Sequence, residues 1–248
     1  MKEVRRFIFR VKFFLRYPVK SLRYLFSNEK DYSKISLSSI FKYIQDARLI
    51  VEAGAADGVD TMRFSLEYPN SRVVALEPVN EQFTYLKKKF ADFKNVEVYN
   101  LALSNHSGIT QMYLGKSDGH LGGLGSSSLL PPDQHRRYFP QIEFSEIQQV
   151  EAVTLEELLM AESQVDLLWL DIQGKELEVL SCSKETFRSK VKEIHLEISR
   201  VPLYVGMPKE KEIRQFLEGA DFRCAEDRVG AISGNALYIN TRFFPGGS

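Results

Sequence analysis

The chain is poor in metal ligands and in long apolar runs. It has two cysteines and four histidines in 248 residues. Cys182 and Cys224 lie far apart without a CxxC pattern, and the histidines do not cluster, so we expect neither a disulfide framework nor a metal site. A reducing, cytoplasmic compartment is the simplest expectation. Lys or Arg interrupts the apolar residues of the N-terminus, so we expect no signal peptide and no membrane span.

A net charge is also missing, because 33 Lys and Arg balance 33 Asp and Glu. Residues 1–26 nevertheless carry eight Lys or Arg and one Glu, a charge of +7, which leaves −7 for the rest of the chain. An acidic body excludes a uniformly basic nucleic-acid-binding domain. We therefore expect no nucleic-acid partner, and we divide the chain into a basic arm, residues 1–30, and a body, residues 31–245.

The arm has the pattern of an amphipathic helix. Its apolar residues recur at helical spacing from Val4 to Leu15, Arg5 and Lys12 fall on another side, and Pro18 ends the pattern. Basic and aromatic residues together suit peripheral binding to an anionic membrane, here the inner face. A helix packed on its own domain, or on the partner of a homodimer, explains the same pattern.

In the body, apolar runs rich in β-prone residues alternate with helical patterns, which is typical of a parallel sheet covered by helices on both faces. We expect strands at residues 49–53, 72–76, 96–99, 166–171 and 193–198, and helices at 59–67, 81–90, 175–180 and 209–218. Two late strands, at 222–226 and 236–241, suggest an antiparallel hairpin at the sheet edge. The glycine- and serine-rich residues 104–150 break the alternation and are expected to form a lid or substrate-binding insertion, with surface decoration as the alternative.

Two motifs predict an adenosine-containing cofactor. The first buried strand runs into a turn of small residues, Gly54 to Gly58, at the carboxyl edge where nucleotide-like ligands bind. Its G-x-x-x-G spacing lacks the G-x-G-x-x-G of a pyrophosphate cradle, which disfavours a dinucleotide. The second buried strand ends in Glu77 and Pro78. A carboxylate at that strand end can accept hydrogen bonds from both ribose hydroxyls.

The later strands bring further polar residues to the same edge. Asn100 to Ala102 follow the third strand, where an adenine could rest on the backbone. Asp171 ends the fourth strand, and His195 and Glu197 belong to the fifth. Buried apolar strands rarely end in acids by accident. Asp171 is therefore the first candidate for a catalytic base, with Glu197, His195 or a loop histidine, His120 or His135, as substitutes.

Seven motifs in one order resemble the FkbM-type S-adenosylmethionine-dependent methyltransferases. They are V-E-A-G-A-x-x-G, A-L-E-P, N-L-A-L-S, G-L-G-S-S-S-L, V-T-L-E-E-L-L, L-W-L-D-I-Q-G-K-E-L-E-V-L and H-L-E. The resemblance implies the class I methyltransferase fold, a Rossmann-like α/β sheet of seven mostly parallel strands with an antiparallel last strand. It also implies S-adenosylmethionine as the cofactor.

The resemblance assigns roles to individual residues. The expected cofactor-binding residues are Glu52, Gly54, Ala55, Asp57, Gly58, Thr61, Glu77, Pro78, Asn100, Leu101, Ala102 and Asp171. The expected substrate-binding residues are Ser126, Ser127, Ser128, Gln173 and Glu176. The chain departs from the family pattern in two places. Glu52 stands where the family usually has Asp, and Gln173 stands where D-V-E-G has its Glu, which puts in question any role of that carboxylate here.

The implied reaction is O-methylation of a hydroxyl on a carbohydrate, glycan or natural product. A nicotinamide-dependent oxidoreductase is an alternative, because Glu77 also suits NAD. A noncatalytic binding module with the same fold is another. A nucleic-acid methyltransferase is a third, although D-I-Q-G stands where an N-P-P-Y-like stretch is expected.

If the basic arm lies on membranes, the intact protein should sediment with anionic vesicles at low salt, and added salt should release it. A variant that lacks residues 1–26 should stay in the supernatant. Equal binding of the shortened and the intact protein would contradict the assignment.

Overall fold

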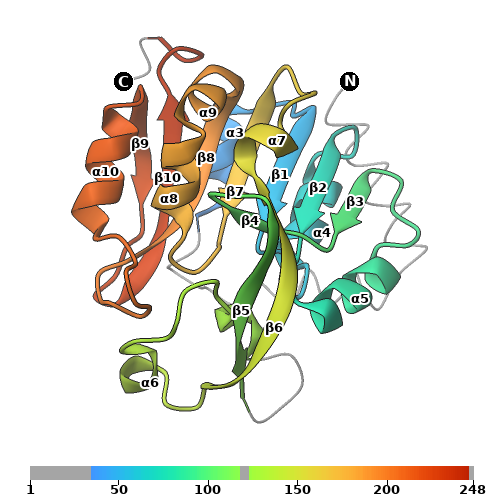
Figure 1. The fold of residues 1–248 in the computed structure, drawn as a ribbon. Coiled ribbons are helices and arrows are strands. Elements are labelled where there is room, and N and C mark those ends of the chain that lie inside the picture. The colour runs from blue at the N-terminus through green and yellow to red at the C-terminus, as the bar shows by residue number, and fades with distance from the viewer. Residues whose placement is uncertain (1–34, 118–122, 246–248) are drawn as a thin grey trace.

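A computed structural model describes residues 35–117 and 123–245 of the chain (Figure 1). The basic arm predicted for residues 1–26, and the candidate His120, lie outside the described residues. Within the described ranges, no helix has both the length and the apolar character needed to cross a membrane.

The main sheet has seven strands in the order β3-β2-β1-β7-β8-β10-β9. Their bounds are Val96–Tyr99 for β3, Arg72–Leu76 for β2, Leu49–Ala53 for β1, Val165–Leu170 for β7, Val191–Ser199 for β8, Ser233–Asn240 for β10 and Phe222–Asp227 for β9. The first five are parallel neighbours, and β10 runs antiparallel to both β8 and β9. The fold implied by the resemblance is confirmed. The last strand β10 inserts one place inside the sheet, which leaves β9 at the edge.

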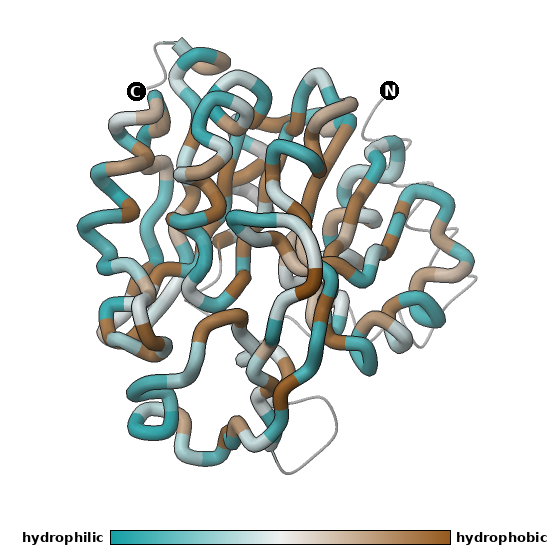
Figure 2. Tube along the Cα trace, viewed as in Figure 1, coloured by the Kyte–Doolittle hydropathy of each residue, from teal (hydrophilic) through white to brown (hydrophobic). Residues whose placement is uncertain are grey.

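Helices cover both faces of this sheet, as the alternating pattern predicted. On one face α3 (Leu37–Tyr43), α4 (Val59–Glu67) and α5 (Asn80–Lys89) bury apolar residues such as Ile40, Phe64 and Leu86. On the other face lie α7 (Leu155–Leu158), α8 (Glu176–Cys182), α9 (Lys184–Lys190) and α10 (Glu210–Glu218), with Val179 and Phe187 in the core. All five residues of β1 are buried, and four of them are apolar, as in a strand covered on both faces. Figure 2 shows the hydrophobic segments gathered in the central strands.

The segment that breaks the alternation folds into a second sheet, in the order β4-β6-β5. Its strands are β4 (Ala102–Ser104), β5 (Gly108–Lys116) and β6 (Glu143–Thr154), and the short helices η1 (Leu124–Ser126) and α6 (His135–Tyr138) lie between β5 and β6. Side chains alternate between the two faces of β5 and β6, and those on one face join an apolar cluster that contains Met112, Leu114, Val150 and Ala152. Sequence analysis predicted an insertion here but not its strands. Figure 1 shows the ribbon of β5 and β6 extending beyond the main sheet.

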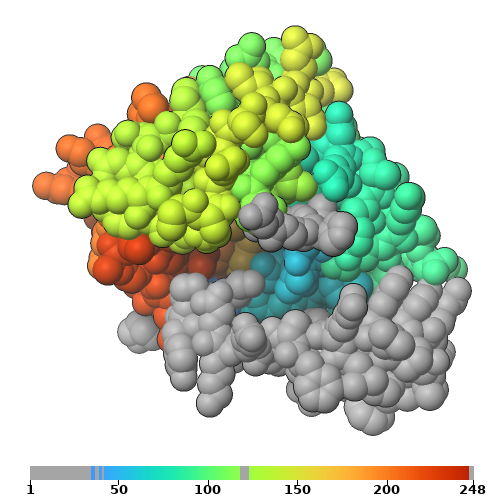
Figure 3. Space-filling model, turned by 90° about the horizontal axis from the view of Figure 1, so that it is seen from below, coloured from blue at the N-terminus to red at the C-terminus, as the bar shows by residue number. Residues whose placement is uncertain are grey.

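The insertion lies against the segment that follows β8. Asp133 donates its backbone N–H to the Leu203 carbonyl at 2.8 Å, and Val205 donates to the Pro131 carbonyl at 2.8 Å. Figure 3 shows the yellow-green insertion in contact with the orange-red C-terminal part of the chain. Residues far apart in the sequence therefore form one wall at the carboxyl edge of the main sheet.

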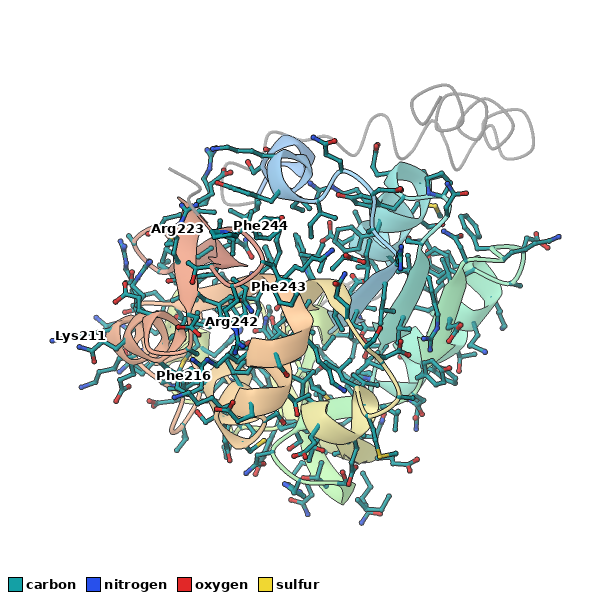
Figure 4. All side chains as sticks on the ribbon, turned by 90° about the horizontal axis from the view of Figure 1, so that it is seen from above. Lys211, Phe216, Arg223, Arg242, Phe243 and Phe244 are labelled. Atoms are coloured by element: carbon teal, nitrogen blue, oxygen red, sulfur yellow. The ribbon has the colours of Figure 1, made fainter. Side chains whose placement is uncertain are left out.

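The C-terminal residues close the opposite end of the molecule. Phe243 and Phe244 follow β10, and the Phe244 ring meets the Tyr43 ring of α3 edge-on, with centroids 5.7 Å apart (Figure 4). Lys211 points outward from α10 in the same view. This end of the molecule holds none of the residues predicted for the site.

Candidate active site

A cavity of about 110 Å³ lies at the carboxyl ends of β1, β2 and β7, under the β5–β6 insertion. It is lined by Gly54, Ala56, Glu77, Pro78, Val79, Gln82, Leu101, Ala102, Leu103, Met112, Leu124, Gly125, Ser127, Leu129, Asp171 and Ile172. The lining joins the two motifs that predicted a cofactor, the end of the fourth predicted strand, and the glycine-serine segment of the insertion. One cavity therefore contains the parts that the sequence placed at this edge.

The turn after β1 touches the end of β7 directly. Gly54 has a φ of +87°, and a Cβ built on it would lie 1.9 Å from the Asp171 carbonyl oxygen. The N–H groups of Gly54 and Ala55 both donate to the Leu76 carbonyl, each at 3.0 Å. Only glycine fits a left-handed backbone in such close contact. The contact brings Gly54 and Asp171 together in the lining of the cavity.

Glu77 joins the first two turns of the site. Its carboxylate accepts the N–H of Ala56 on one oxygen and the N–H of Val79 on the other, both at 2.8 Å. The side chain is 3% exposed. Burial, together with the Asp171 charge, raises the pKa of Glu77 to about 7, against the effect of the two N–H donors. Each oxygen has a second lone pair, so the pair of oxygens fits two adjacent hydroxyl donors.

Asn100 supports this turn from behind. Its side-chain N–H₂ donates to the Glu77 carbonyl at 2.9 Å and to the Pro78 carbonyl at 3.0 Å. The cavity wall beyond it is apolar and comes from Leu101, Leu103 and Met112. Asn100 itself is not among the lining residues, whereas the predicted Leu101 and Ala102 are.

At the end of β7, Asp171 lines the cavity and Gln173 stands beside it. The Gln173 side-chain amide donates one N–H to Asp171 Oδ1 and one to Glu197 Oε2, each at 2.7 Å. Glu197 lines a second, smaller cavity together with Gln173 and Glu176. Burial, followed by the charges of Asp171 and Glu176, raises the pKa of Glu197 well above its usual range.

Several residues predicted for the cofactor lie behind the cavity wall. Glu52 is buried and accepts a hydrogen bond from the Thr61 hydroxyl at 2.5 Å. Burial raises its pKa, and the charge of Asp60 adds to the effect. Asp57 accepts the N–H of Val59 at 3.0 Å. None of these residues, nor Ala55 or Gly58, lines the main cavity. For Glu52 the reason is the alternation along β1, which directs its side chain away from the opening.

The predicted substrate residues divide in the same way. Ser127 lines the cavity, whereas the buried Ser128 donates its hydroxyl to the Gln173 carbonyl at 2.7 Å. Ser126 contributes its carbonyl, which accepts the Tyr204 hydroxyl at 2.7 Å. Glu176 is buried and accepts the N–H groups of Ile172 and Gly174, each at 3.1 Å. Its carboxylate therefore holds the turn after β7, and burial raises its pKa to about 7.

The structure does not bring His195 to either cavity. Its ring is buried and stacks on Trp169, with centroids 3.2 Å apart and planes at 4°. Trp169 and His195 are paired residues of β7 and β8. They lie two positions before Asp171 and Glu197, respectively. His135, the other histidine candidate within the described residues, packs against Phe139, Phe144 and Tyr204.

Sequence analysis missed several residues of the cavity. Gln82 lies on α5 and Met112 on β5, and neither stands in a motif that predicts a ligand. Leu124, Gly125 and Leu129 do lie in or beside the glycine-serine motif, and that motif was the one indication of their place. Tyr204 was missed as well, because it follows β8 in a segment without a recognisable pattern.

The described residues fit an adenosine-containing group. Glu77 presents two acceptor oxygens for a vicinal diol, the apolar wall suits a flat ring, and the Gly54 turn leaves room for an extended substituent. Asp171 and Glu77 also favour a cation. No cluster of three or more His, Cys, Asp or Glu able to hold a metal ion occurs among residues 35–117 and 123–245.

The family comparison agrees with this site. The profile of the methyltransferase FkbM domain matches residues 52–224, more than half of the chain. The chain therefore belongs to the FkbM methyltransferase family. The prediction of a methyltransferase with S-adenosylmethionine as its cofactor is confirmed at this level.

Individual relatives are more distant. The chain is 24% identical over 197 residues to the 2-O-methyltransferase NoeI of Sinorhizobium fredii, which covers 78% of this chain and 80% of NoeI. Among solved structures, magnesium protoporphyrin IX methyltransferase of Synechocystis with bound SAM is 10% identical, with a TM-score of 0.47 and coverage of 82% and 75%. The N-terminal domain of EvdMO1 with SAH and D-fucose is 12% identical, with a TM-score of 0.45 and coverage of 82% and 79%.

The Gly54 contact predicts a large loss of stability on substitution. G54A places a methyl group within 1.9 Å of a backbone oxygen at a positive φ, so we expect the free energy of unfolding to fall by about 3 kcal/mol or more. G125A is the matched control, because nothing lies within 4 Å of its added Cβ. Urea unfolding of the two variants should separate them. Equal stability would contradict the close contact.

The buried Glu77 predicts a pH dependence of stability. Its pKa is about 7 in the folded protein and near 4.5 when unfolded, so the folded state binds an extra proton between these values. Stability from this group is complete below pH 4.5 and is lost as the pH rises through 7, by roughly 3 kcal/mol. E77Q should remove that part of the loss in urea titrations. E151Q, at an exposed position of β6, should retain the wild-type profile.

Proposed function

We propose that this methyltransferase transfers the methyl group of S-adenosylmethionine to a hydroxyl of an uncharged carbohydrate, glycan or natural product. The observation that carries the proposal is the single cavity that Glu77 and Asp171 both line, from the ends of β2 and β7 on either side of β1. The first carboxylate suits a ribose, and the second suits a hydroxyl that must lose its proton.

Each part of the cavity has a share in holding the cofactor. Glu77 accepts the ribose hydroxyls, Leu101 and Met112 border the adenine, and the Gly54 turn receives the methionine end. S-adenosylmethionine supplies a methyl group activated by its sulfonium charge. Hydrogen bonds within the protein fix the Gly54 turn and the Glu77 carboxylate in position.

Asp171 accepts the proton of the acceptor hydroxyl. S-adenosylmethionine would supply the methyl group, and its S–CH3 bond would break to leave S-adenosylhomocysteine. The Asp171 carboxylate would take the proton released from the O–H bond of the acceptor. Among the candidate bases, Asp171 lines the main cavity and Glu197 lines the smaller one, whereas His195 and His135 line neither. The insertion contributes Leu124 and Leu129 to the lining, which makes that part of the cavity wall apolar.

The charge of the lining favours a neutral acceptor. No Lys, Arg or His is among the described residues that line the two cavities, whereas four carboxyl groups are: Glu77, Asp171, Glu176 and Glu197. An anionic group on the acceptor beside the hydroxyl would be repelled there. The relative NoeI, which is named a 2-O-methyltransferase, supports a hydroxyl as the acceptor.

Two alternatives predict different binding. An oxidoreductase would bind NAD, and a noncatalytic module would bind a ligand without any methyl transfer. Membership in the FkbM family and the missing G-x-G-x-x-G favour the methyltransferase over the oxidoreductase. The noncatalytic module is separated from the enzyme by measuring transfer itself.

Calorimetric titration should show binding of S-adenosylhomocysteine and none of NAD. With tritiated S-adenosylmethionine and a panel of neutral glycosides, wild type should label at least one acceptor. D171N should lower kcat by about 10²–10⁴-fold while its affinity for S-adenosylhomocysteine changes little. N105D is the control: it exchanges an amide for a carboxylate at a position outside the main cavity, and it should keep most of the activity. Binding of NAD alone would overturn the proposal, and binding of S-adenosylhomocysteine without transfer to any glycoside would favour the noncatalytic module.

A further inference from the structure

Gln173 lies between two partly buried carboxyl groups and uses its whole side-chain amide. Its two N–H bonds point to Asp171 Oδ1 and Glu197 Oε2, both at 2.7 Å, and its oxygen accepts the Tyr204 hydroxyl at 2.9 Å. A primary amide has two donor hydrogens and one acceptor oxygen. The three contacts therefore define which end of the amide faces the carboxyl groups.

Tyr204 holds the amide in that orientation. Its buried hydroxyl lies between the Gln173 side-chain oxygen at 2.9 Å and the Ser126 carbonyl at 2.7 Å, and it shares one proton between them. If the amide flipped, its N–H₂ would face this hydroxyl and its oxygen would face two carboxylates. That arrangement is electrostatically unfavourable in a buried site.

The backbone of Gln173 is held from the side of the insertion. Its φ of +54° is uncommon for a residue other than glycine, and its carbonyl accepts the Ser128 hydroxyl at 2.7 Å. Strained backbone of this kind persists only when its surroundings over-determine it, and it occurs often at functional sites. Gln173 is thus fixed at its backbone by Ser128 and at its amide by Tyr204.

The two carboxyl groups need such a bridge. Buried carboxylates side by side repel each other unless a donor or a proton lies between them. In agreement, the pKa of Glu197 is raised well above its usual range by burial and by the charges of Asp171 and Glu176. The amide supplies two N–H donors without adding a charge. A carboxyl group at position 173 would add a third acid instead.

We propose that Gln173 is a positioning residue: its amide, oriented by Tyr204, holds Asp171 against Glu197 and so keeps the Asp171 carboxylate directed into the main cavity. This rests on the proposed function, in which Asp171 accepts the proton of the acceptor. Tyr204 also contacts Ser126 of the insertion, so the same hydroxyl connects the cover of the cavity to the base.

The test compares thermal unfolding of the full chain from pH 5.5 to 8.5 in wild type, Q173E, Q173M and Y204F. Q173E adds a buried carboxyl that takes up about one proton on folding, so its Tm should fall with pH by roughly 3–5 °C per unit more than that of wild type. Q173M removes the donors and should steepen the fall less. Y204F should act in the same direction as Q173M but less strongly, because the amide oxygen then loses its hydroxyl donor and the amide is held less firmly.

The matched control is Q149E, the same substitution at an exposed position of β6, which should follow the wild-type slope. Slopes of Q173E and Q173M equal to that of wild type would overturn the proposal. If Q173E does not fold, Q173M and Y204F decide it.

A crystal structure of Q173M with S-adenosylhomocysteine gives a second reading. We expect the Asp171 carboxylate to turn away from the main cavity, and an unchanged Asp171 side chain would overturn the positioning role. Failure of wild type to bind S-adenosylhomocysteine would count against the proposed function alone, since the pH slopes are measured without any ligand.

Discussion

The site depends on one buried carboxylate, that of Glu77, which accepts backbone N–H groups from two turns at once. Through Ala56 it fixes the turn after β1, and through Val79 it fixes the turn after β2. These are the turns that form one side of the main cavity. Glu77 also lines the cavity, so the group that organises the site is also the group suited to a ribose. Glu77 therefore both stabilises the two turns and is suited to bind the cofactor.

Burying these carboxyl groups lowers the stability of the folded protein. Burial raises the pKa values of Glu77 and Glu176 to about 7 and raises that of Glu197 well above its usual range, so the folded protein holds carboxyl groups that would ionise more readily in water. Such perturbed groups cluster at functional sites. Hydrogen bonds offset part of the cost of burying these groups. Backbone N–H groups donate to Glu77 and Glu176, and the Gln173 amide donates to Glu197.

The sequence predicted most of the main sheet and the centre of the site, for a local reason. Continuous apolar strands, the Gly54 turn and the acids at strand ends are short-range patterns, and parallel topology brings strand ends together. The ribbon β5–β6 was missed because its glycines and serines obscured the alternation of Met112 and Leu114. The supporting roles of Glu52, Ser128 and Glu176, and the part of Tyr204, depend on contacts between distant segments. Side-chain direction at a strand end cannot be read from spacing alone.

The central claim is that one cavity holds both the cofactor, with its ribose on Glu77, and the acceptor, with its hydroxyl on Asp171. A crystal structure of the full chain with S-adenosylhomocysteine tests it most directly. The account predicts both ribose hydroxyls on the Glu77 carboxylate and the sulfur on the side of Asp171, with open space between the sulfur and that carboxylate for an acceptor. A nucleoside bound elsewhere, or a ribose turned away from Glu77, would contradict it.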